Sequence, residues 1–428
     1  MKKVLVIGGG GREHALARGL SKSQHVEKVF VCPGNPGMCL GQDEQDAPIE
    51  CVPISGTDIP SLVSFAQSMA IDLTVVGPEQ SICAGVVDAF LENDLPILGP
   101  TKKAAQIESS KKYAKEQMKQ AGVRCADYQS FSGRAEDMEQ ALDYMRKQSL
   151  PIVIKQDGLA AGKGVIIAQS YEEAAQTIED FVDHGEPFII EEFLTGEEFS
   201  FFTLVNGSQC IPLMAARDYK RAFDQDQGKN TGGMGAFSPV PFVDELLAQR
   251  VQDEIVQPLM DHLVAIGNPY TGVLYTGAML NDKGIYVIEF NARFGDPETQ
   301  IMLQRIKNDL YELFAASVHG QKAIAEMNDN YCLGVVVAAE GYPQKAVVGQ
   351  PLLFTEDFAF NSADFAGVAR DEQGQLIANG GRLFMVLHQA PTLAECRRYV
   401  YEQLSAQNLP YTFYRKDIGE KFAKETDI

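Results

Sequence analysis

The sequence contains no apolar stretch of about 18 residues, the length that a membrane-spanning helix requires. It also shows no signal peptide, because residues 3–7 read as a β-strand and no cleavage site follows them. We therefore expect a soluble protein of the cytoplasm that has no membrane partner.

Basic residues are few compared with acidic ones. The chain has 37 Lys and Arg against 58 Asp and Glu, which gives a net charge of -21 at pH 7. Nonspecific nucleic-acid binding needs clustered basic side chains, so we expect no nucleic-acid partner. An anionic substrate would have to be held by backbone N–H groups or by a few well-placed cations.

Zinc-site spacing is also missing. The eight cysteines form no Cys-x-x-Cys pair, and none lies beside a histidine at the spacing of a zinc site. Most have apolar neighbours, as Cys32 and Cys332 do. We expect buried free thiols in a reducing cytosol.

The sequence does contain regular alternations of strand and helix signals. Its 428 residues are enough for about two to four domains. Residues 1–100 alternate β and α, which predicts a parallel sheet with right-handed crossovers. Residues 123–190 read as a small α/β module, a longer α+β stretch follows, and antiparallel strand signals begin at residue 332. The predicted fold class is therefore α/β and α+β in several domains.

The most informative segment is residues 289–300, Glu-Phe-Asn-Ala-Arg-Phe-Gly-Asp-Pro-Glu-Thr-Gln. It continues a run of β-branched and aromatic residues that reads as a strand. Because side chains alternate along a strand, Glu289, Asn291 and Arg293 are expected on one face. Ile288 and Phe290 are expected on the other. A carboxylate, an amide oxygen and a guanidinium on one face suit a Mg²⁺ ion that carries phosphate, and a half-exposed edge strand is the alternative.

Residues 8–14, Gly-Gly-Gly-Gly-Arg-Glu-His, follow the first predicted strand and open a helix. Backbone N–H groups and the helix dipole can hold a phosphate at such a position. A dinucleotide fingerprint does not fit, because Glu13 stands where the third Gly is needed and residues 33–37 offer no acid for a ribose. This disfavours a nicotinamide oxidoreductase. A phosphate without a nicotinamide is the interpretation we favour over a plain tight turn.

Residues 157–164, Asp-Gly-Leu-Ala-Ala-Gly-Lys-Gly, lie between two predicted strands. The string is one residue short for a Walker A loop and has Gly164 in place of Ser or Thr, so a P-loop NTPase is disfavoured. A Gly-rich hairpin that carries Lys163 can still fold over a triphosphate. Lys155, at the end of the preceding strand, is either an exposed strand end or a phosphate ligand.

Two further segments are less specific. Residues 189–198 run from a strand into an acidic turn that can bind an adenine edge and ribose hydroxyls; a solvated turn is the alternative. Residues 230–236, Asn-Thr-Gly-Gly-Met-Gly-Ala, are too rich in Gly for the interior of a helix or strand. They either bring backbone close to a small substrate or form a flexible connection.

In this order, the segments resemble the ATP-grasp ligases and, among them, the phosphoribosylamine–glycine ligase family. The resemblance covers essentially the whole chain, and residues 293–300 are its most specific string. It also rests on residues 10–16, 33–35, 76–79, 157–165, 230–236, 379–382 and 415–419. It implies an N-terminal substrate-binding α/β domain (1–100), an ATP-grasp core (101–122 and 190–325), a small lid domain (123–189) and a C-terminal mixed β domain (326–428).

The resemblance implies a reaction of purine biosynthesis. ATP would phosphorylate the carboxylate of glycine, and the amine of 5-phosphoribosylamine would attack the acyl phosphate to give glycinamide ribonucleotide, ADP and phosphate. The protein would position the reactants and neutralise charge, without a covalent nucleophile. The implied cofactors are ATP and Mg²⁺ or Mn²⁺, the partners are the two small-molecule substrates, and we expect a monomer.

On the nucleotide side, the resemblance assigns a group of residues to ATP and its metal. Lys111 and Lys155 are expected to contact the phosphates beneath a lid made of Gly162, Lys163 and Gly164. Glu191, Phe193 and Leu194 are expected to line the adenine pocket, and Glu198 to hold the ribose. Glu289 and Asn291 are expected to bind the metal ion.

On the substrate side, Asp218 and Arg293 are the candidates for the ammonium and carboxylate groups of glycine, since opposite charges suit a zwitterion. Together with Lys155 they form the expected catalytic set. Gly10, Gly11, Glu13 and Asn35 are expected to meet the phosphoribosylamine.

One departure from the family pattern concerns the metal. Many ATP-grasp enzymes carry a second metal-binding Glu near position 277, where this chain has Gly277, so a second carboxylate ligand is left unassigned. Two alternatives stay open at this stage. One is an ATP-grasp ligase for a different amine or carboxylate, which residues 293–300 disfavour. The other is a nucleotide-binding regulator without activity, which has no need of Lys155 and the metal pair.

Overall fold

The structure is a computed structural model that describes residues 1–159 and 164–424. Its N-terminal region is a parallel five-stranded sheet of order β3-β2-β1-β4-β5. The strands are β1 Lys2–Gly8, β2 Val26–Pro33, β3 Ile49–Cys51, β4 Leu73–Val76 and β5 Ile97–Leu98. The helices are α1 Gly11–Ser21, α2 Ile59–Met69, α3 Glu79–Ala84 and α4 Val86–Glu92. The apolar residues of β1 are fully buried, as a parallel sheet covered on both faces requires.

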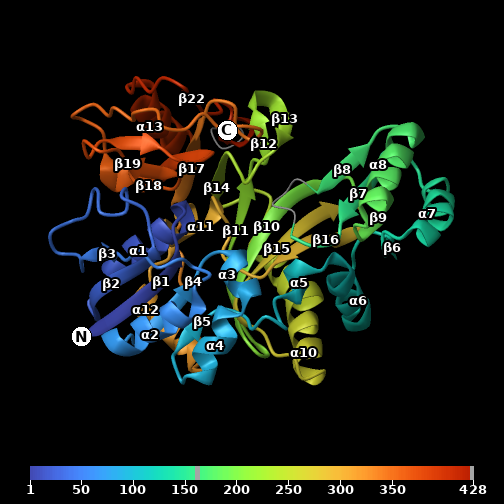
Figure 1. The fold of residues 1–428 in the computed structure, drawn as a ribbon, viewed down its shortest axis with the longest axis horizontal. Coiled ribbons are helices and arrows are strands. Elements are labelled where there is room, and N and C mark those ends of the chain that lie inside the picture. Colours follow the sequence, from blue (N-terminus) through green and yellow to red (C-terminus); the bar gives the residue numbers. More distant parts are fainter. Residues whose placement is uncertain (160–163, 425–428) are drawn as a thin grey trace.

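A small lid projects from the body of the molecule (Figure 1). Its antiparallel sheet has the order β6-β9-β7-β8, with β6 Tyr128–Phe131, β7 Ile152–Gln156, β8 Val165–Ala168 and β9 Phe188–Glu192. The helices η1 Ala135–Asp137, α7 Met138–Met145 and α8 Tyr171–His184 complete it. Stacked rings of Phe131, Phe181 and Phe188 lie in its own small core.

Among the described residues, a nine-stranded sheet forms the centre and continues into the C-terminal region. Its central strands are β10 Glu197–Asn206, β11 Gln209–Asp218, β14 Gly235–Ser238, β15 Thr271–Asn281 and β16 Gly284–Asn291, and a separate hairpin joins β12 Arg221–Phe223 to β13 Gln227–Asn230. The accompanying helices are α5 Gln106–Ser109, α6 Lys111–Ala121, η2 Asp224–Asp226, α9 Glu245–Val251, η3 Gln252–Val256, α10 Gln257–Ala265, α11 Glu298–Arg305 and α12 Leu310–Val318.

The C-terminal strands join the same sheet through the pairing of β14 with β17. They are β17 Tyr331–Ala339, β18 Ala363–Phe365, β21 Arg382–Ala390 and β22 Thr412–Phe413, beside a hairpin of β19 Val368–Arg370 and β20 Leu376–Ala378. The helices are η4 Phe360–Ser362, α13 Leu393–Ser405 and α14 Glu420–Ala423. Because one sheet runs through both regions, the boundaries of the expected domains stay a prediction.

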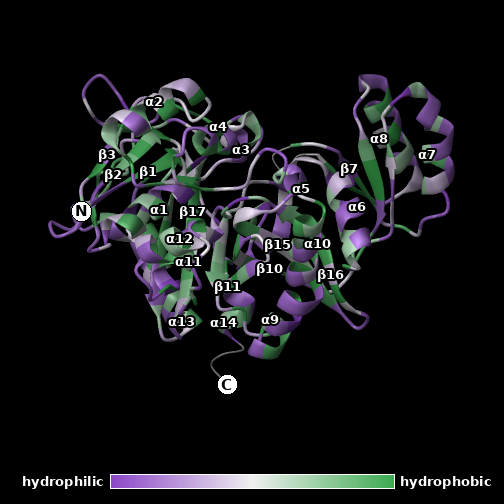
Figure 2. Cartoon of the chain, turned by 90° about the horizontal axis from the view of Figure 1, so that it is seen from below, coloured by the Kyte–Doolittle hydropathy of each residue, from purple (hydrophilic) through white to green (hydrophobic). Residues whose placement is uncertain are grey.

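Hydrophobic residues concentrate in the strands and on the inner sides of the helices, whereas the outer helix faces are hydrophilic (Figure 2). In the described part of the chain, none of the helices is both long and apolar enough to span a bilayer. The predicted fold class is confirmed: a parallel N-terminal region, an ATP-grasp-like centre with a lid, and an antiparallel C-terminal region.

A β-bulge in β16 changes the expected alternation of side chains. Glu289 pairs with Gly277, but the next pair is Val287 with Ala278, so Ile288 is an extra residue. Val287 and Phe290 are both buried in the same core cluster. Residues three positions apart point to opposite faces of a regular strand, so the extra residue is what allows both to face the core. The bulge therefore turns Glu289 out of the core. The prediction that Ile288 lies opposite Glu289 was wrong, since both are half-buried between the buried residues Val287 and Phe290, whereas Phe290 is buried as predicted.

Candidate functional site

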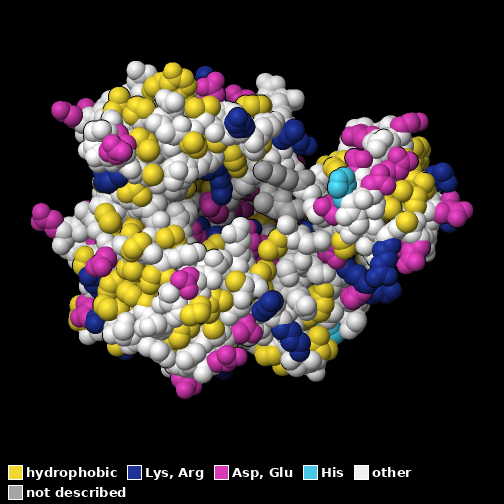
Figure 3. Space-filling model, viewed as in Figure 1, with side chains coloured by type: hydrophobic (Ala, Val, Ile, Leu, Met, Phe, Trp, Pro, Cys, Tyr) yellow, Lys and Arg dark blue, Asp and Glu magenta, His cyan; other side chains and the backbone are white. Residues whose placement is uncertain are grey.

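A pocket opens where the lid faces the central sheet and the N-terminal region. Its lining mixes charged and apolar side chains, and Figure 3 shows charged side chains of both signs inside the central hollow of the molecule. We call it the charged pocket; its lining includes Glu79, Glu108, Lys111, Lys115, Lys155, Gly164, Glu191, Glu289, Asn291 and Arg293. Seven of the residues predicted from sequence thus lie around one cavity, although they come from five segments of the chain.

The inner wall of the charged pocket is a carboxylate between two ammonium groups. Glu191 lies 2.8 Å from Lys155 Nζ and 3.1 Å from Lys115 Nζ, and the three residues are between 2% and 7% exposed. Burial opposes the ionisation of Glu191, but the two ammonium groups outweigh it and lower the pKa of this carboxyl group. Lys155 is therefore a buried, oriented cation, and the alternative of an exposed strand end is wrong.

Lys111 enters the pocket from the first turn of α6. Its Nζ donates a hydrogen bond to the carbonyl of Gly158 (3.0 Å), at the start of the Gly-rich segment. Asp157 accepts from the backbone N–H of Lys111 (2.5 Å), so the loop and the helix N-terminus hold each other. Burial lowers the pKa of Lys111, and the carboxylate of Glu289 counteracts part of this effect. Gly164 lies at the pocket, whereas Gly162 and Lys163 lie outside the described residues.

The bulge in β16 presents Glu289 and Asn291 to the pocket together. Opposite Glu289 stands Gly277, where an added Cβ would lie only 3.2 Å from the Cγ of Glu289. A second carboxylate at 277 would therefore crowd the first. No cluster of three His, Cys, Asp or Glu side chains suited to a metal occurs in the chain that the structure describes. The pair still fits Mg²⁺, which takes one or two protein carboxylates and completes its shell with phosphate oxygens and water.

A second set of carboxylates surrounds Lys220, beside Glu289. The Nζ of Lys220 lies 2.7 Å from Glu198 and 3.8 Å from Glu289. Lys220 lowers the pKa of Glu198, while burial raises the pKa of Asp218 and, with Asp218 nearby, raises the pKa of Glu298 to about 8. The surroundings thus supply more negative charge than Lys220 neutralises. A cation, such as an ammonium group, is the group that this cluster would bind most favourably.

Arg293 is held by two carboxylates from the N-terminal half of the chain. Its Nε lies 3.0 Å from Glu79 and 3.2 Å from Glu108, and Glu108 also accepts from the backbone N–H of Ala292 (2.7 Å). Burial acts to lower the pKa of the guanidinium, but Glu108 and Glu79 outweigh this effect and raise it. The two carboxylates lie at the Nε edge of the Arg293 guanidinium and thus fix its orientation before any substrate binds.

Residues 8–11, which we call the glycine loop, are shaped by Glu13. The carboxylate of Glu13 folds back to accept from the N–H of Gly10 (2.6 Å) and from Arg12 Nε (2.6 Å). A Cβ at Gly8 or Gly77 would collide with the Glu13 side chain, and Gly8 has a φ of +129°. The glycines therefore allow the carboxylate to cap the loop from within.

Asn35 holds the neighbouring loop in the same manner. Its Nδ2 donates to the carbonyls of Gly9 (2.9 Å) and Phe365 (2.9 Å), and its Oδ1 accepts from the N–H of Gly37 (2.9 Å). It is buried, at 7% exposure. The amide thus joins the glycine loop to the C-terminal region and has its principal hydrogen-bonding groups engaged.

The Gly-rich segment 230–236 is anchored rather than free. Arg382 donates to the carbonyls of Gly232 (2.6 Å) and Asp296 (3.0 Å) and forms an ion pair with the carboxylate of Asp296 (2.9 Å). An added Cβ at Gly233 would lie 2.4 Å from Pro297. The alternative of a flexible connection is therefore wrong for this segment, which is clamped beside residues 296–297.

Comparison with known proteins identifies the family. Three domain families match consecutive parts of the chain: the phosphoribosylglycinamide synthetase N domain (2–108), its ATP-grasp (A) domain (109–299) and its C domain (332–421). The phosphoribosylamine–glycine ligase of Lactococcus lactis subsp. lactis is 44% identical over 421 residues, which cover 98% of this chain and 99% of the relative. The chain belongs to the phosphoribosylglycinamide synthetase family.

Solved structures agree with this assignment. A phosphoribosylamine–glycine ligase from Thermotoga maritima superposes with a TM-score of 0.82 at 32% identity and covers 97% of this chain and 100% of its own. A biotin carboxylase domain from Hydrogenobacter thermophilus, with MgADP and bicarbonate bound, shares the fold at a TM-score of 0.70 and 16% identity, covering 96% of this chain and 91% of its own. As a member of the phosphoribosylglycinamide synthetase family, the chain is an ATP-grasp enzyme that binds ATP.

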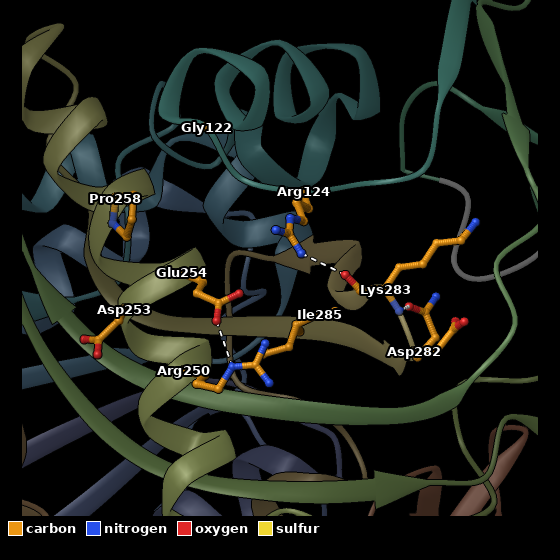
Figure 4. A pocket seen from close by; sticks show the side chains of 11 residues that line it. Gly122, Arg124, Arg250, Asp253, Glu254, Pro258, Asp282, Lys283 and Ile285 are labelled. Atoms are coloured by element: carbon orange, nitrogen blue, oxygen red, sulfur yellow. Dashed lines mark hydrogen bonds and ion pairs between the residues drawn. The ribbon is translucent and has the colours of Figure 1, made fainter.

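A second pocket lies at the β15–β16 hairpin, between α6 and the α9–η3 segment (Figure 4). Two of its three basic side chains are engaged: Arg124 donates to the carbonyl of Lys283 (3.0 Å), and Arg250 pairs with Glu254 (2.8 Å). None of the predicted site residues that the structure describes lines it. The predicted site residues that line a pocket in the described structure therefore line the charged pocket.

Of the predicted nucleotide-site residues, several lie away from the lining of the charged pocket. Phe193 is 38% exposed and Leu194 is half-buried, both just after β9. Glu198 and the glycine candidate Asp218 do not line the charged pocket. Glu198 pairs with Lys220, whose Nζ lies 3.8 Å from Glu289 at the pocket. Whether Phe193 and Leu194 meet an adenine ring stays a prediction.

Sequence reasoning missed four residues that the structure places in or beside the charged pocket: Lys115, Lys220, Glu108 and Glu298. Lys115 had a signal, since it stands one helical turn after Lys111. Glu298 lies inside the most specific string, and its burial at 3% exposure is unusual for a Glu. Lys220 and Glu108 gave no local signal, because their partners are distant in sequence.

Proposed function

We infer that this protein is a carbon–nitrogen ligase that joins glycine to 5-phosphoribosylamine at the expense of ATP, in purine biosynthesis. The proposal rests on family membership over the whole chain and on one observation in the structure. Lys111, Lys155, Glu289 and Asn291, which the family resemblance assigns to ATP and its metal, line one cavity. We further propose that the enzyme acts as a monomer in the cytoplasm. The net charge of -21 supports the proposal that it has no nucleic-acid partners.

In the proposed reaction, ATP phosphorylates the glycine carboxylate, and the amine of phosphoribosylamine then attacks the resulting glycyl phosphate. Lys111 and Lys155 bind the phosphate oxygens, and Gly162, Lys163 and Gly164 cover them. Glu289 and Asn291 would hold a Mg²⁺ or Mn²⁺ ion, which supplies Lewis-acid stabilisation of phosphate charge. The Lys115–Glu191–Lys155 network keeps the Lys155 ammonium oriented, so its attraction to phosphate costs little reorganisation.

The remaining nucleotide contacts follow the strand into the hinge. Phe193 and Leu194 line the adenine pocket together with the backbone around Glu191. The carboxylate of Glu191 itself forms ion pairs with Lys155 and Lys115. Glu198 holds the ribose, and its pairing with Lys220 (2.7 Å) keeps it ionised as a hydrogen-bond acceptor.

Glycine is proposed to bind between Asp218 and Arg293. Asp218 has its pKa raised by burial and by neighbouring carboxylates, so an ammonium group beside it would relieve this destabilisation. Arg293, oriented by Glu79 and Glu108, faces the carboxylate that is to be phosphorylated. Gly10, Gly11, Glu13 and Asn35 form the phosphoribosylamine site, with Glu13 and Asn35 holding the loops in shape.

The test is phosphate release from ATP with Mg²⁺, with glycine and freshly made phosphoribosylamine omitted in turn. Release that requires both supports the proposal. Release with other carboxylates or amines would overturn the substrate assignment while keeping ATP-grasp chemistry. No release under any condition would overturn the proposal and favour a nucleotide-binding protein without activity.

A further inference from the structure

Two cysteines lie together beside the loop that carries Asn35. Cys51 ends β3, and its Sγ lies 3.4 Å from the carbonyl oxygen of Asn35. Cys39 stands in the turn that follows Asn35, with its Sγ 3.6 Å from the carbonyl oxygen of Ile49. Each thiol therefore contacts the segment that carries the other, so both lie between residues 35–39 and residues 49–51. Cys39 is exposed, contrary to the expectation of buried thiols throughout the chain.

The surroundings of Cys39 favour its thiolate. The Cys51 thiol and the Arg370 guanidinium both act to lower the pKa of Cys39, which is about 6, whereas partial burial and the carboxylate of Glu50 act to raise it. Thiolates, not thiols, react with peroxides, and reactive cysteines are both accessible and low in pKa. By contrast, burial raises the pKa of Cys32 to about 12. Cys39 thus differs from the buried thiols in both respects.

We propose that Cys39 and Cys51 form an oxidative modification site that a hydroperoxide converts into an intramolecular disulfide. The Cys39 thiolate attacks one peroxide oxygen, the O–O bond breaks, and the leaving hydroxide takes a proton to become water. The sulfur of Cys51 then attacks the Cys39 sulfenic acid, the S–S bond forms, and the S–O bond breaks to release a second water with the Cys51 proton. Two thiols lose two electrons, and one hydrogen peroxide is reduced to two waters.

The disulfide would act on the substrate loop. Cys51 is packed against this loop so closely that a Cβ at Gly34 would lie 2.4 Å from its Sγ. Oxidation removes the S–H that points to the Asn35 carbonyl and ties the residue after the loop to β3. The loop then shifts, and binding of phosphoribosylamine weakens while ATP binding is kept. This consequence rests on the proposed role of Asn35 in the phosphoribosylamine site.

The test treats the full-length enzyme with hydrogen peroxide and maps thiols by peptide mass spectrometry before and after reduction. We expect a Cys39–Cys51 crosslink at peroxide concentrations that leave Cys83 unmodified. In Cys51→Ser, which lacks the resolving thiol, Cys39 is expected to accumulate as a sulfenic acid that dimedone traps. Absence of both the crosslink and the trapped sulfenic acid would overturn the proposal.

Kinetics then test the consequence. The oxidised enzyme is expected to show a KM for phosphoribosylamine several-fold higher, an unchanged KM for ATP, and full recovery with a dithiol reductant. Cys39→Ser should have normal activity and no response to peroxide, whereas the matched control Cys83→Ser should respond as wild type does. A crosslink without any change in kinetics would overturn the link to the loop. If the reduced enzyme showed no amine-dependent activity, the proposed function would fail, but the crosslink would still be seen.

Discussion

The charged pocket and the glycine loop, which we propose bind ATP and phosphoribosylamine, are built in different ways. In the charged pocket, the buried carboxylate of Glu191 holds Lys155, and the partly buried carboxylates of Glu79 and Glu108 hold Arg293. At the glycine loop, the side chains of Glu13 and Asn35 are bonded to the loop itself. The first site therefore depends on charges supplied by side chains. The second depends on a backbone shape that side chains maintain.

This contrast predicts that substitutions in the charged pocket act mainly on chemistry or on electrostatic stability, and those at the loop on the binding of one substrate. The largest effect is expected for Glu289→Gln. Removal of the charge at the proposed metal site should lower kcat by at least about 100-fold and leave the fold intact, because the side chain stabilises charge that develops in the reaction.

Measurement of kcat at saturating Mg²⁺, together with the melting curve, checks this expectation. Glu254→Gln is a matched control, because Glu254 forms an exposed ion pair with Arg250 far from the charged pocket. Turnover of Glu289→Gln close to wild type would show that this carboxylate is not a ligand.

Glu191→Gln should produce the largest loss of stability. It leaves Lys115 and Lys155 buried without their shared counter-charge, which costs about 3–5 kcal/mol when one partner of a buried pair is removed. Urea unfolding measures the loss. Glu197→Gln is the comparison, since Glu197 pairs with Arg217 at 45% exposure and should cost about 0–1 kcal/mol. Equal losses in the two variants would remove the distinction between buried and exposed pairs.

Asp218→Ala should raise the KM for glycine far more than the KM for ATP. Loss of a buried partner for the glycine ammonium costs about 2 kcal/mol or more, which corresponds to a rise of about 30-fold. Initial rates with each substrate varied in turn give the two constants. If both rose by the same factor, Asp218 would support the site in general and would not bind the zwitterion.

Asn35→Ala should affect the loop side alone. It removes the hydrogen bonds to Gly9, Gly37 and Phe365, which we expect to cost about 1–3 kcal/mol of stability. The KM for phosphoribosylamine should rise while the KM for ATP stays constant. The control Asn93→Ala removes exposed hydrogen bonds and should leave both constants unchanged. A rise in the KM for ATP would show that the two sites are not separate.

The smallest effect is expected for Glu298→Gln, through pH. The folded-state pKa of Glu298, about 8, lies above its ordinary 4.5, so the fold favours the neutral carboxyl group. The stability that this group contributes is fully present below about pH 4.5 and is lost as the pH rises towards 8. The amide of Gln does not ionise, so the variant should melt like wild type at pH 4.5 and a few degrees higher at pH 9. Parallel melting curves across this range would contradict a neutral Glu298.

The sequence alone predicted much of the fold and part of the site. Strand and helix periodicity in residues 1–100 was enough for the parallel sheet, because each β and α segment carries its own pattern. Lys155, Glu289, Asn291 and Arg293 were singled out from local strings, Lys111 came from the family resemblance, and the structure places all of them at one cavity.

Other features depend on contacts between distant segments, which no local pattern contains. The bulge at Ile288 decides that Glu289 faces the cavity rather than the core, and it follows from pairing with β15. Likewise, Glu108 meets Arg293 only because α5 packs beside β16. The sequence alone therefore determined the fold class and the types of residue that could form the site. The tertiary structure decided which charges are buried together, because burial and the distance between charges set their energies.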